Sequence, residues 1–218
     1  MSDPSTFEAT LHRLFDAERA VRGLRDEVDA AARRGAGATF DAVGLAITAA
    51  RAEASEDERT LRLAALAGVL GELSGARAVD LLIDILASEE AEARHAAGSE
   101  LEELASHRFK EVALGVERAL GRLPDESPAL SELPYILADI PEAGVTKLLG
   151  LFLAHRAPDA VAAGIDVAVL TGDRALLPAL AKLAGDKRVV AVDDDENEDA
   201  RATIDELARE ATSLLEAD

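Results

Sequence analysis

The chain has 218 residues, of which 49% are hydrophobic and 30% charged, and this balance is typical of a folded protein rather than a disordered acidic tail. A formal net charge of −20 disfavours a general nucleic-acid binder, because so acidic a surface repels phosphate backbones. The lack of cysteine excludes disulfides, thiolate metal sites and cysteine nucleophiles.

Neither a secretory leader nor a membrane span is expected from the sequence. The N-terminus lacks a basic segment followed by an apolar one, and no run of about 18 apolar residues occurs. We therefore expect a cytoplasmic protein. Two interpretations of the acidity stay open: a solvated surface that aids solubility, or a docking face for a basic partner.

Residues 5–34 are predicted to form one long helix, with Ser5 and Glu8 at the spacing of a capping box. Apolar or small residues recur along it at heptad spacing, which is typical of a coiled-coil seam. Leu11 and Phe15 broaden the apolar face, so the helix can either join two copies of the chain as a homodimer or cap one end of the fold. The seam consists of Phe7, Thr10, Leu14, Ala17, Val21, Leu24, Val28 and Ala31.

Residues 75–105 predict two amphipathic helices joined by an acidic turn, and this pair recurs along the chain. A pair of this kind cannot bury both apolar stripes alone, so it needs neighbours of its own kind. Val79 matches Val145 and Leu176, which lie 66 and 97 residues further on, so the period is 32–34 residues. The two stripes are Val79, Leu82, Ile83 and Leu86, then Ala93, Ala96, Ala97, Leu101 and Leu104.

The pair is predicted both before and after this stretch. Thr39–Ala54 pairs with Glu56–Leu73, and Phe109–Arg122 opens the third unit. The second helix of that unit contains Pro134, where we expect a break or kink because proline removes an intrahelical hydrogen bond.

The last unit differs because its turn is enlarged over residues 186–199. Three valines at its start favour a short extended arm, and Thr203–Leu215 is the final helix. The predicted fold is therefore all-α: a right-handed α-α superhelix of about five helical hairpins over residues 39–218. Residues 1–34 form a separate N-terminal unit.

Two of the second helices resemble the signature of the HEAT-repeat proteins, in particular their bacterial branch related to phycobilisome lyases. That signature reads approximately V-R-x-x-A-A-x-x-x-L, and it stands here as Leu61-Arg62…Ala64-Ala65…Val69 and as Ala93-Arg94…Ala96-Ala97…Leu101. The resemblance covers about residues 39–216 and implies a solenoid whose second helices tend to line the concave face. It implies no particular activity, because this scaffold hosts many binding tasks.

On that basis the exposed residues of the second helices are candidates for binding a protein partner in the concave groove. They are Arg62, His95, Ser99, Glu102, Glu103 and Asp166. No His-Glu-x-x-His, glycine-rich phosphate loop or Gly-x-Ser-x-Gly motif occurs, and the four histidines lie far apart in the sequence. We therefore expect neither catalysis nor a bound cofactor.

The acidic run in the enlarged turn is a second candidate surface. Its alternating oxygen ligands resemble the start of a calcium-binding EF-hand loop, but Glu198 stands where that loop needs glycine and Ile204 where it needs a bidentate glutamate. A solvated loop or a contact for a basic partner is favoured instead. The acidic residues are Asp193, Asp194, Asp195, Glu196, Glu198 and Asp199.

Together these features predict a non-catalytic scaffold or adaptor that binds another protein through its concave face or its acidic C-terminal end. The alternative is an acidic inhibitor or immunity protein that blocks a basic, nucleic-acid-acting enzyme. An enzyme or chaperone acting on a chromophore, as the resemblance to phycobilisome lyases suggests, is a third hypothesis.

Overall fold

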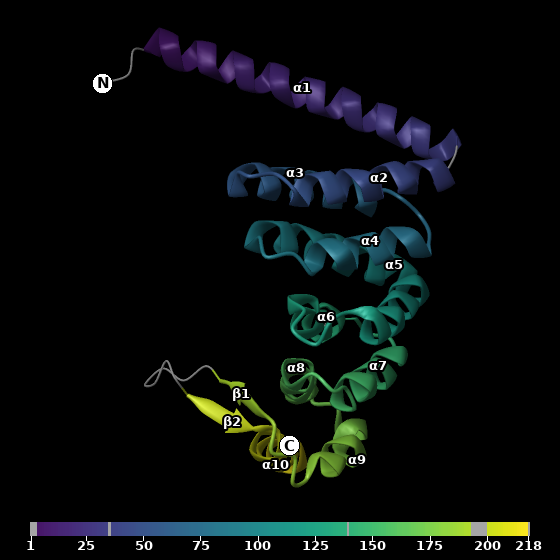
Figure 1. Ribbon diagram of the computed structural model, residues 1–218, viewed down its shortest axis with the longest axis vertical. Helices are drawn as coiled ribbons and strands as arrows, with labels where there is room; N and C mark the ends of the chain where they lie inside the picture. The colour runs from purple at the N-terminus through teal and green to yellow at the C-terminus, as the bar shows by residue number, and fades with distance from the viewer. Residues whose placement is uncertain (1–3, 35, 139, 193–199, 218) are drawn as a thin grey trace.

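The computed structural model describes residues 4–34, 36–138, 140–192 and 200–217. These residues form ten α-helices, two short 3-10 turns and one two-stranded antiparallel ribbon (Figure 1), which confirms the predicted all-helical class. The helices are α1 (Pro4–Arg34), α2 (Ala36–Arg51), α3 (Glu56–Gly71), α4 (Ala76–Leu86), α5 (Ala91–Arg122), α6 (Pro128–Ala138), α7 (Gly144–Leu153), α8 (Pro158–Leu170), α9 (Leu177–Leu180) and α10 (Ile204–Ala217). The 3-10 turns are Arg174–Leu176 and Ala181–Leu183, and the ribbon pairs β1 (Val189–Ala191) with β2 (Arg201–Thr203).

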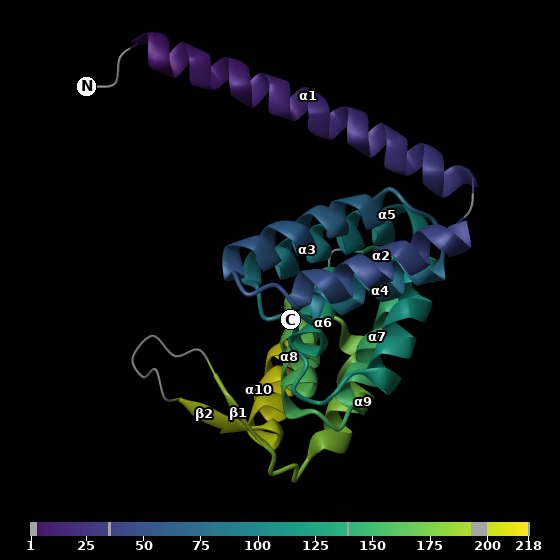
Figure 2. The same cartoon turned by 45° about the horizontal axis from the view of Figure 1, so that its top comes forward.

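After α1, five helical hairpins lie one below another in chain order (Figure 1). They are α2 with α3, α4 with the first half of α5, the second half of α5 with α6, α7 with α8, and α9 with α10. The second helices contact one another, since α3 packs on α5, α5 on α6, α6 on α8 and α8 on α10. Figures 1 and 2 both place α3, α6, α8 and α10 on one side of the array, with α2, α7 and α9 on the other.

Helix α5 consists of two helices that belong to two successive hairpins. Arg108, with φ −137° and ψ 44°, is non-helical, and the kink there separates the two helices. The Arg108 guanidinium donates a hydrogen bond of 3.0 Å to the carbonyl of Leu73, which ties the bend to the end of the preceding hairpin. The sequence predicts two helices at this place, and they are joined with almost no turn.

One core runs through all five hairpins and consists mainly of leucine, valine and alanine. Small residues let some helices approach closely: a Cβ added at Gly115 of α5 would overlap Val79 Cγ1 of α4. Burying each leucine contributes about 1.5–3 kcal/mol, so each hairpin is stabilised chiefly through its neighbours. Large side chains that are fully buried include Leu63, Leu70, Leu82, Ile83, Leu101, Leu133, Leu148 and Phe152.

Ion pairs join successive hairpins on the outside of this core. Each links residues about one repeat apart, so basic residues of one hairpin meet acidic residues of the next. Most are partly exposed and contribute little individually, but they favour one register of stacking. They are Arg59–Glu90, Arg77–Asp41, Arg94–Glu132, Arg118–Asp80, Arg122–Asp84, Lys147–Glu117 and Arg156–Asp125.

The repeat register that the sequence predicts at α3 is wrong by about one helical turn. The prediction equates Arg62 with Arg94, yet Arg59 and Arg94 are the residues that each occupy the fourth position of their helix. Both donate to carbonyls of the turn before the helix, and both pair with a glutamate through Nε at 2.6 Å. Alanine pairs recur so often in this chain that they align equally well in several registers.

The predicted break at Pro134 is also absent from the described residues of α6. That helix runs from Pro128 to Ala138 through Pro134, whose ring is buried. The only intrahelical bond that proline removes there is the one to the carbonyl of Leu130. Core packing of α6 between α5 and α8 offsets that loss.

Helix α1 projects away from the array and touches it mainly near its own C-terminal end (Figures 1 and 2). There Arg22, Arg25, Asp26 and Val28 lie against the end of α3 around a cavity of about 190 Å³. The heptad seam is largely exposed, with Phe7 at 63% and Leu24 at 60%. The apolar face of α1 is thus left uncovered.

Candidate functional site

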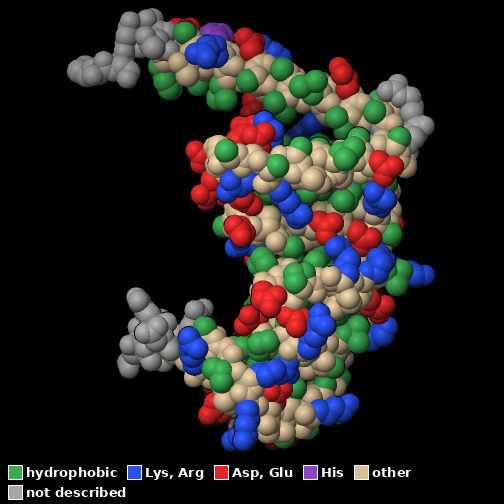
Figure 3. Space-filling view, viewed as in Figure 1, with side chains coloured by type: hydrophobic (Ala, Val, Ile, Leu, Met, Phe, Trp, Pro, Cys, Tyr) green, Lys and Arg blue, Asp and Glu red, His purple; other side chains and the backbone are tan. Residues whose placement is uncertain are grey.

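An open groove of about 610 Å³ lies beside α6, α8, β1 and α10. It lies on the side of the second helices, where Figures 1 and 3 show the outline of the molecule curving inward between α3 and the ribbon. Elements that are far apart in the sequence therefore share one wall. The groove has the volume and openness suited to a few side chains of another molecule.

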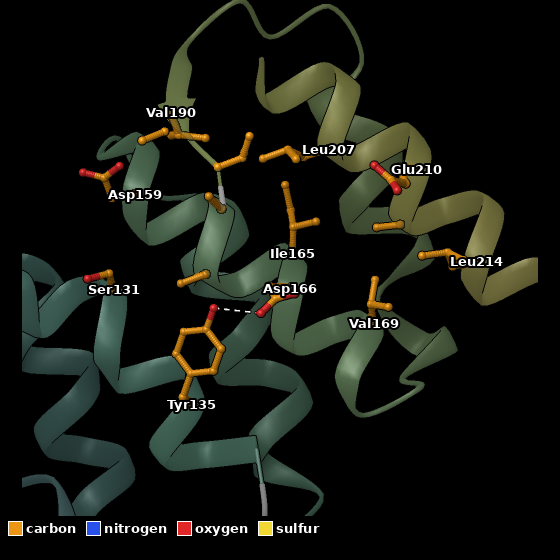
Figure 4. A pocket seen from close by; sticks show the side chains of 15 residues that line it. Ser131, Tyr135, Asp159, Ile165, Asp166, Val169, Val190, Leu207, Glu210 and Leu214 are labelled. Atoms are coloured by element: carbon orange, nitrogen blue, oxygen red, sulfur yellow. Dashed lines mark hydrogen bonds between the residues drawn. The ribbon is translucent and has the colours of Figure 1, made fainter. Parts of the chain in front are cut away.

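The floor of the groove is apolar. Figure 4 shows Ile165 and Val169 of α8 directed toward Leu207 and Leu214 of α10. Leu214 remains 49% exposed, so the groove offers an accessible apolar contact rather than a closed core. The lining residues are Ser131, Tyr135, Asp159, Ala162, Ala163, Ile165, Asp166, Val169, Val190, Ala191, Val192, Leu207, Glu210, Ala211 and Leu214.

The β ribbon closes one end of the groove and is held by Arg188. Its guanidinium binds the Asp186 carboxylate through Nε and Nη2, at 3.0 and 2.6 Å to Oδ2. Its Nη1 donates to the carbonyls of His155 and Arg156 at the turn before α8, at 2.9 and 2.6 Å. The hydrogen bonds from Arg188 hold the pKa of Asp186 below its usual range. One side chain thereby fixes the ribbon on the α7–α8 hairpin.

Helix α10 starts directly after β2 with a complete capping box. The hydroxyl of Thr203 accepts a hydrogen bond from the backbone N–H of Glu206 at 3.2 Å, and the Glu206 carboxylate accepts one from the N–H of Thr203 at 2.8 Å. The second bond lowers the pKa of Glu206. This cap sets where α10 begins and so places Leu207, Glu210 and Leu214 along the groove.

The rim of the groove is acidic. The chain's one tyrosine, Tyr135 of α6, is 45% exposed and donates a hydrogen bond of 2.8 Å to Asp166 Oδ2 of α8. Asp159 and Glu210 add two further exposed carboxylates, whereas none of the described lining residues is lysine or arginine. The arrangement is complementary to a cation carried beside apolar groups.

Of the predicted candidates that lie within the described residues, only Asp166 lines this groove. His95, Ser99, Glu102 and Glu103 are exposed on α5, one hairpin nearer the N-terminus. Arg62 is exposed on α3, where it pairs with Glu53 and Glu58 of its own hairpin.

The other predicted candidates, Asp193, Asp194, Asp195, Glu196, Glu198 and Asp199, lie outside the described residues. Their segment connects Val192 to Ala200, and the N–H of Val192 donates to the Ala200 carbonyl at 3.1 Å. Val192 itself lines the groove.

Sequence reasoning missed the hydrophobic half of the site. Tyr135 follows Pro134, where the sequence predicts a break or kink, and it was not among the predicted candidates. The exposure of Leu214 cannot be read from the sequence, because it belongs to an amphipathic pattern whose other members are buried. A half-exposed leucine and the chain's one tyrosine, both on second helices, are signals that point to a contact surface.

A separate acidic cluster lies at the junction of α3 and α5. Glu100 packs over Gly71 and shares a cavity with Glu72 and Glu103. Burial and the two neighbouring carboxylates raise the pKa of Glu100, and Arg25 of α1 partly opposes them. Three carboxylates meet here, but among the described residues no group of histidines and carboxylates has the geometry of a metal site.

The His155 ring is held by two backbone partners. His155 accepts the backbone N–H of Ala157 at Nδ1, so Nε2 carries the proton that binds the Leu120 carbonyl, 3.1 Å away.

Within the described part of the chain, no helix is both long enough and apolar enough to cross a membrane. Comparison with known proteins gives no match to any family model, curated protein or solved structure.

Proposed function

We propose that this protein is a non-catalytic binding scaffold, a HEAT-like solenoid of the cytoplasm, and that its concave groove holds an apolar and basic segment of another protein. The observation that carries the proposal is the groove between α8 and α10, which joins an exposed apolar floor to a rim of carboxylates without a described lysine or arginine. Stacked hairpins with their second helices on one side support the HEAT-like assignment.

A protein segment fits this groove better than a small anionic or wholly apolar molecule. Asp159, Asp166 and Glu210 repel anions and favour lysine or arginine. Tyr135 and Leu214, each about half-exposed, present the kind of amphipathic and apolar side chains that anchor protein interfaces. A helix with leucines along one face and lysines along the other satisfies both the floor and the rim.

The acidic-inhibitor alternative draws on a different property, the net charge of −20. A purely charge-driven complex loses affinity steeply as salt rises and needs no apolar floor. The scaffold proposal requires both the acidic rim and the apolar floor, so the contribution of Leu214 to binding separates the two functions.

The test is a fluorescence-anisotropy titration with a labelled synthetic peptide that has leucines at helical spacing and lysines on the other face. Wild type should bind, and Leu214→Glu should weaken binding about tenfold or more, because it replaces an apolar contact by a buried charge. Leu114→Glu is the matched control, since Leu114 of α5 is 46% exposed and lies outside the groove. Equal affinity of wild type and Leu214→Glu would refute the groove as the binding site.

A further inference from the structure

The exposed face of α1 carries five of the thirteen large hydrophobic residues that are exposed in the described part of the chain. Single exposed leucines are ordinary on protein surfaces, but clustered ones mark contact sites. Figure 3 shows hydrophobic side chains along the length of α1. Five of them are large and 47–63% exposed: Phe7, Leu14, Phe15, Val21 and Leu24.

All of these residues except Phe15 lie on the heptad seam, so the face has the period of a helix that packs against one other helix. Val28, near the C-terminal end of the seam, is half-buried against α3, whereas Leu14, Val21 and Leu24 are not covered by the array. The contact with α3 involves Arg22, Arg25 and Asp26 beside the seam, which leaves room for a second helix along the seam itself.

Charge identifies the occupant. Residues 1–34 contain seven of the chain's 43 acidic residues and six of its 23 basic ones, so they carry one of the twenty units of net negative charge. Two copies of so acidic a chain repel each other everywhere else. The neutral, projecting α1 is where they can meet.

We propose that α1 pairs in antiparallel orientation with α1 of a second copy, forming a homodimer. In this orientation each layer of the seam pairs a residue at the first heptad position of one copy with a residue at the fourth heptad position of the other. The first positions are Phe7, Leu14, Val21 and Val28, and the fourth positions are Thr10, Ala17, Leu24 and Ala31. Large residues then meet small ones in most layers, which fills the seam evenly. The layers are Phe7 with Ala31, Leu14 with Leu24, Val21 with Ala17, and Val28 with Thr10, each pair formed between the two copies.

One edge of the seam is self-complementary in the same orientation, because Arg13 lies opposite Glu27 of the second copy. On the other edge, Glu18 lies opposite Glu18 of the second copy and Arg25 lies opposite Leu11, so the favourable charge pair is confined to the first edge. Charges at these positions set partner choice and orientation in coiled coils.

Parallel pairing is disfavoured by both packing and charge. It would stack Ala17 on Ala17 and Thr10 on Thr10, leaving small layers between large ones. It would also bring the two acidic arrays to the same end of the coil. Antiparallel helices of 31 residues place their C-terminal ends, from which the two arrays continue, about 45 Å apart, several times the Debye length of about 8 Å at physiological salt.

The first test is the mass of the purified full-length chain by light scattering over a range of concentrations. Wild type should show twice the 22.8 kDa chain mass, and Leu14→Glu with Leu24→Glu should weaken the dimer at least about 100-fold. Leu45→Glu is the matched control, because Leu45 of α2 is exposed but lies off the seam. The groove lies at the other end of the array, so all these variants should still bind the synthetic peptide.

Disulfide trapping tests the orientation, since the native chain has no cysteine. A mixture of Leu14→Cys and Leu24→Cys chains should cross-link between the two variants under oxidation. Cross-linking of Leu14→Cys chains to one another instead would overturn the antiparallel arrangement.

Three results would overturn the dimer itself. One is a monomeric mass at every concentration up to the solubility limit, including the case in which the monomer binds phospholipid vesicles through α1. The second is a dimer that persists in the double glutamate variant. The third is loss of the dimer in Leu45→Glu, which would move the interface from α1 to α2.

Discussion

The contact between α4 and α5 makes a prediction about two glycines that differ only in their surroundings. A Cβ at Gly115 overlaps Val79 Cγ1, far inside the 3.5–4.0 Å of a normal carbon–carbon contact. Val79 is fully buried and β-branched, so it cannot swing aside, and the two helices must separate. In α7, by contrast, a Cβ at Gly150 meets no atom within 4 Å.

Overpacking costs about 1–3 kcal/mol, and alanine returns about 1 kcal/mol of helix propensity. Gly115→Ala should therefore lower the free energy of unfolding by about 1 kcal/mol, which lowers Tm by about 2–4 °C in a chain of this length. Gly150→Ala should raise Tm instead, by up to about 4 °C. Thermal unfolding followed by circular dichroism measures both.

A double variant checks the cause. In a Val79→Ala background, the added methyl group at position 115 has space, so Gly115→Ala should cost much less there than in wild type. Two results would refute the packing of α4 on α5: a Gly115→Ala chain as stable as wild type, or an equal cost in both backgrounds.

Two further predictions concern pH. Because the pKa of Glu100 is raised, the favourable contribution of its neutral form is lost as pH rises through that pKa. Glu100→Gln should thus have a higher Tm than wild type at neutral pH and the same Tm as wild type in acid. A higher Tm of wild type at neutral pH would contradict the clustering of Glu100 with Glu72 and Glu103. Arg188 lowers the pKa of Asp186, so the pair stabilises the ribbon at pH values above the pKa of Asp186 in the unfolded chain. This stabilisation is lost as pH falls through the pKa of Asp186 in the folded chain. Arg188→Lys cannot keep the forked contact, so hydrogen exchange in β1 should accelerate at a higher pH than in wild type, and identical profiles would refute this role.

Hydrophobic periodicity in the sequence predicted most of the helices, because stripes such as Val79 to Leu86 are dictated by burial on one helix face. The N-cap at Ser55, whose hydroxyl accepts from the Glu58 N–H, and the arm at Val189 were also predicted correctly. These features depend on residues close together in sequence. The register between hairpins depends instead on residues far apart in sequence. For this reason the sequence equated Arg62 with Arg94, whereas Arg59 makes the contacts that match those of Arg94.

The groove was predicted only in part for a related reason. Asp166 was found because the resemblance to HEAT-repeat proteins singles out exposed residues of second helices. Its neighbours Tyr135, Val190 and Leu214 come from three other elements, and their proximity depends on Arg188 anchoring the ribbon and on the cap of α10. No local pattern encodes such a long-range contact.

The central claim is that this protein binds another protein through the α8–α10 groove, and affinity capture from its own cells tests it most directly. Tagged wild type, Leu214→Glu and Leu114→Glu chains would be compared at low and at high salt. We expect one partner with a basic, apolar segment to be retained by wild type and Leu114→Glu and lost by Leu214→Glu, with partial loss at high salt. A partner retained equally by all three chains, or no partner with any of them, would contradict the claim.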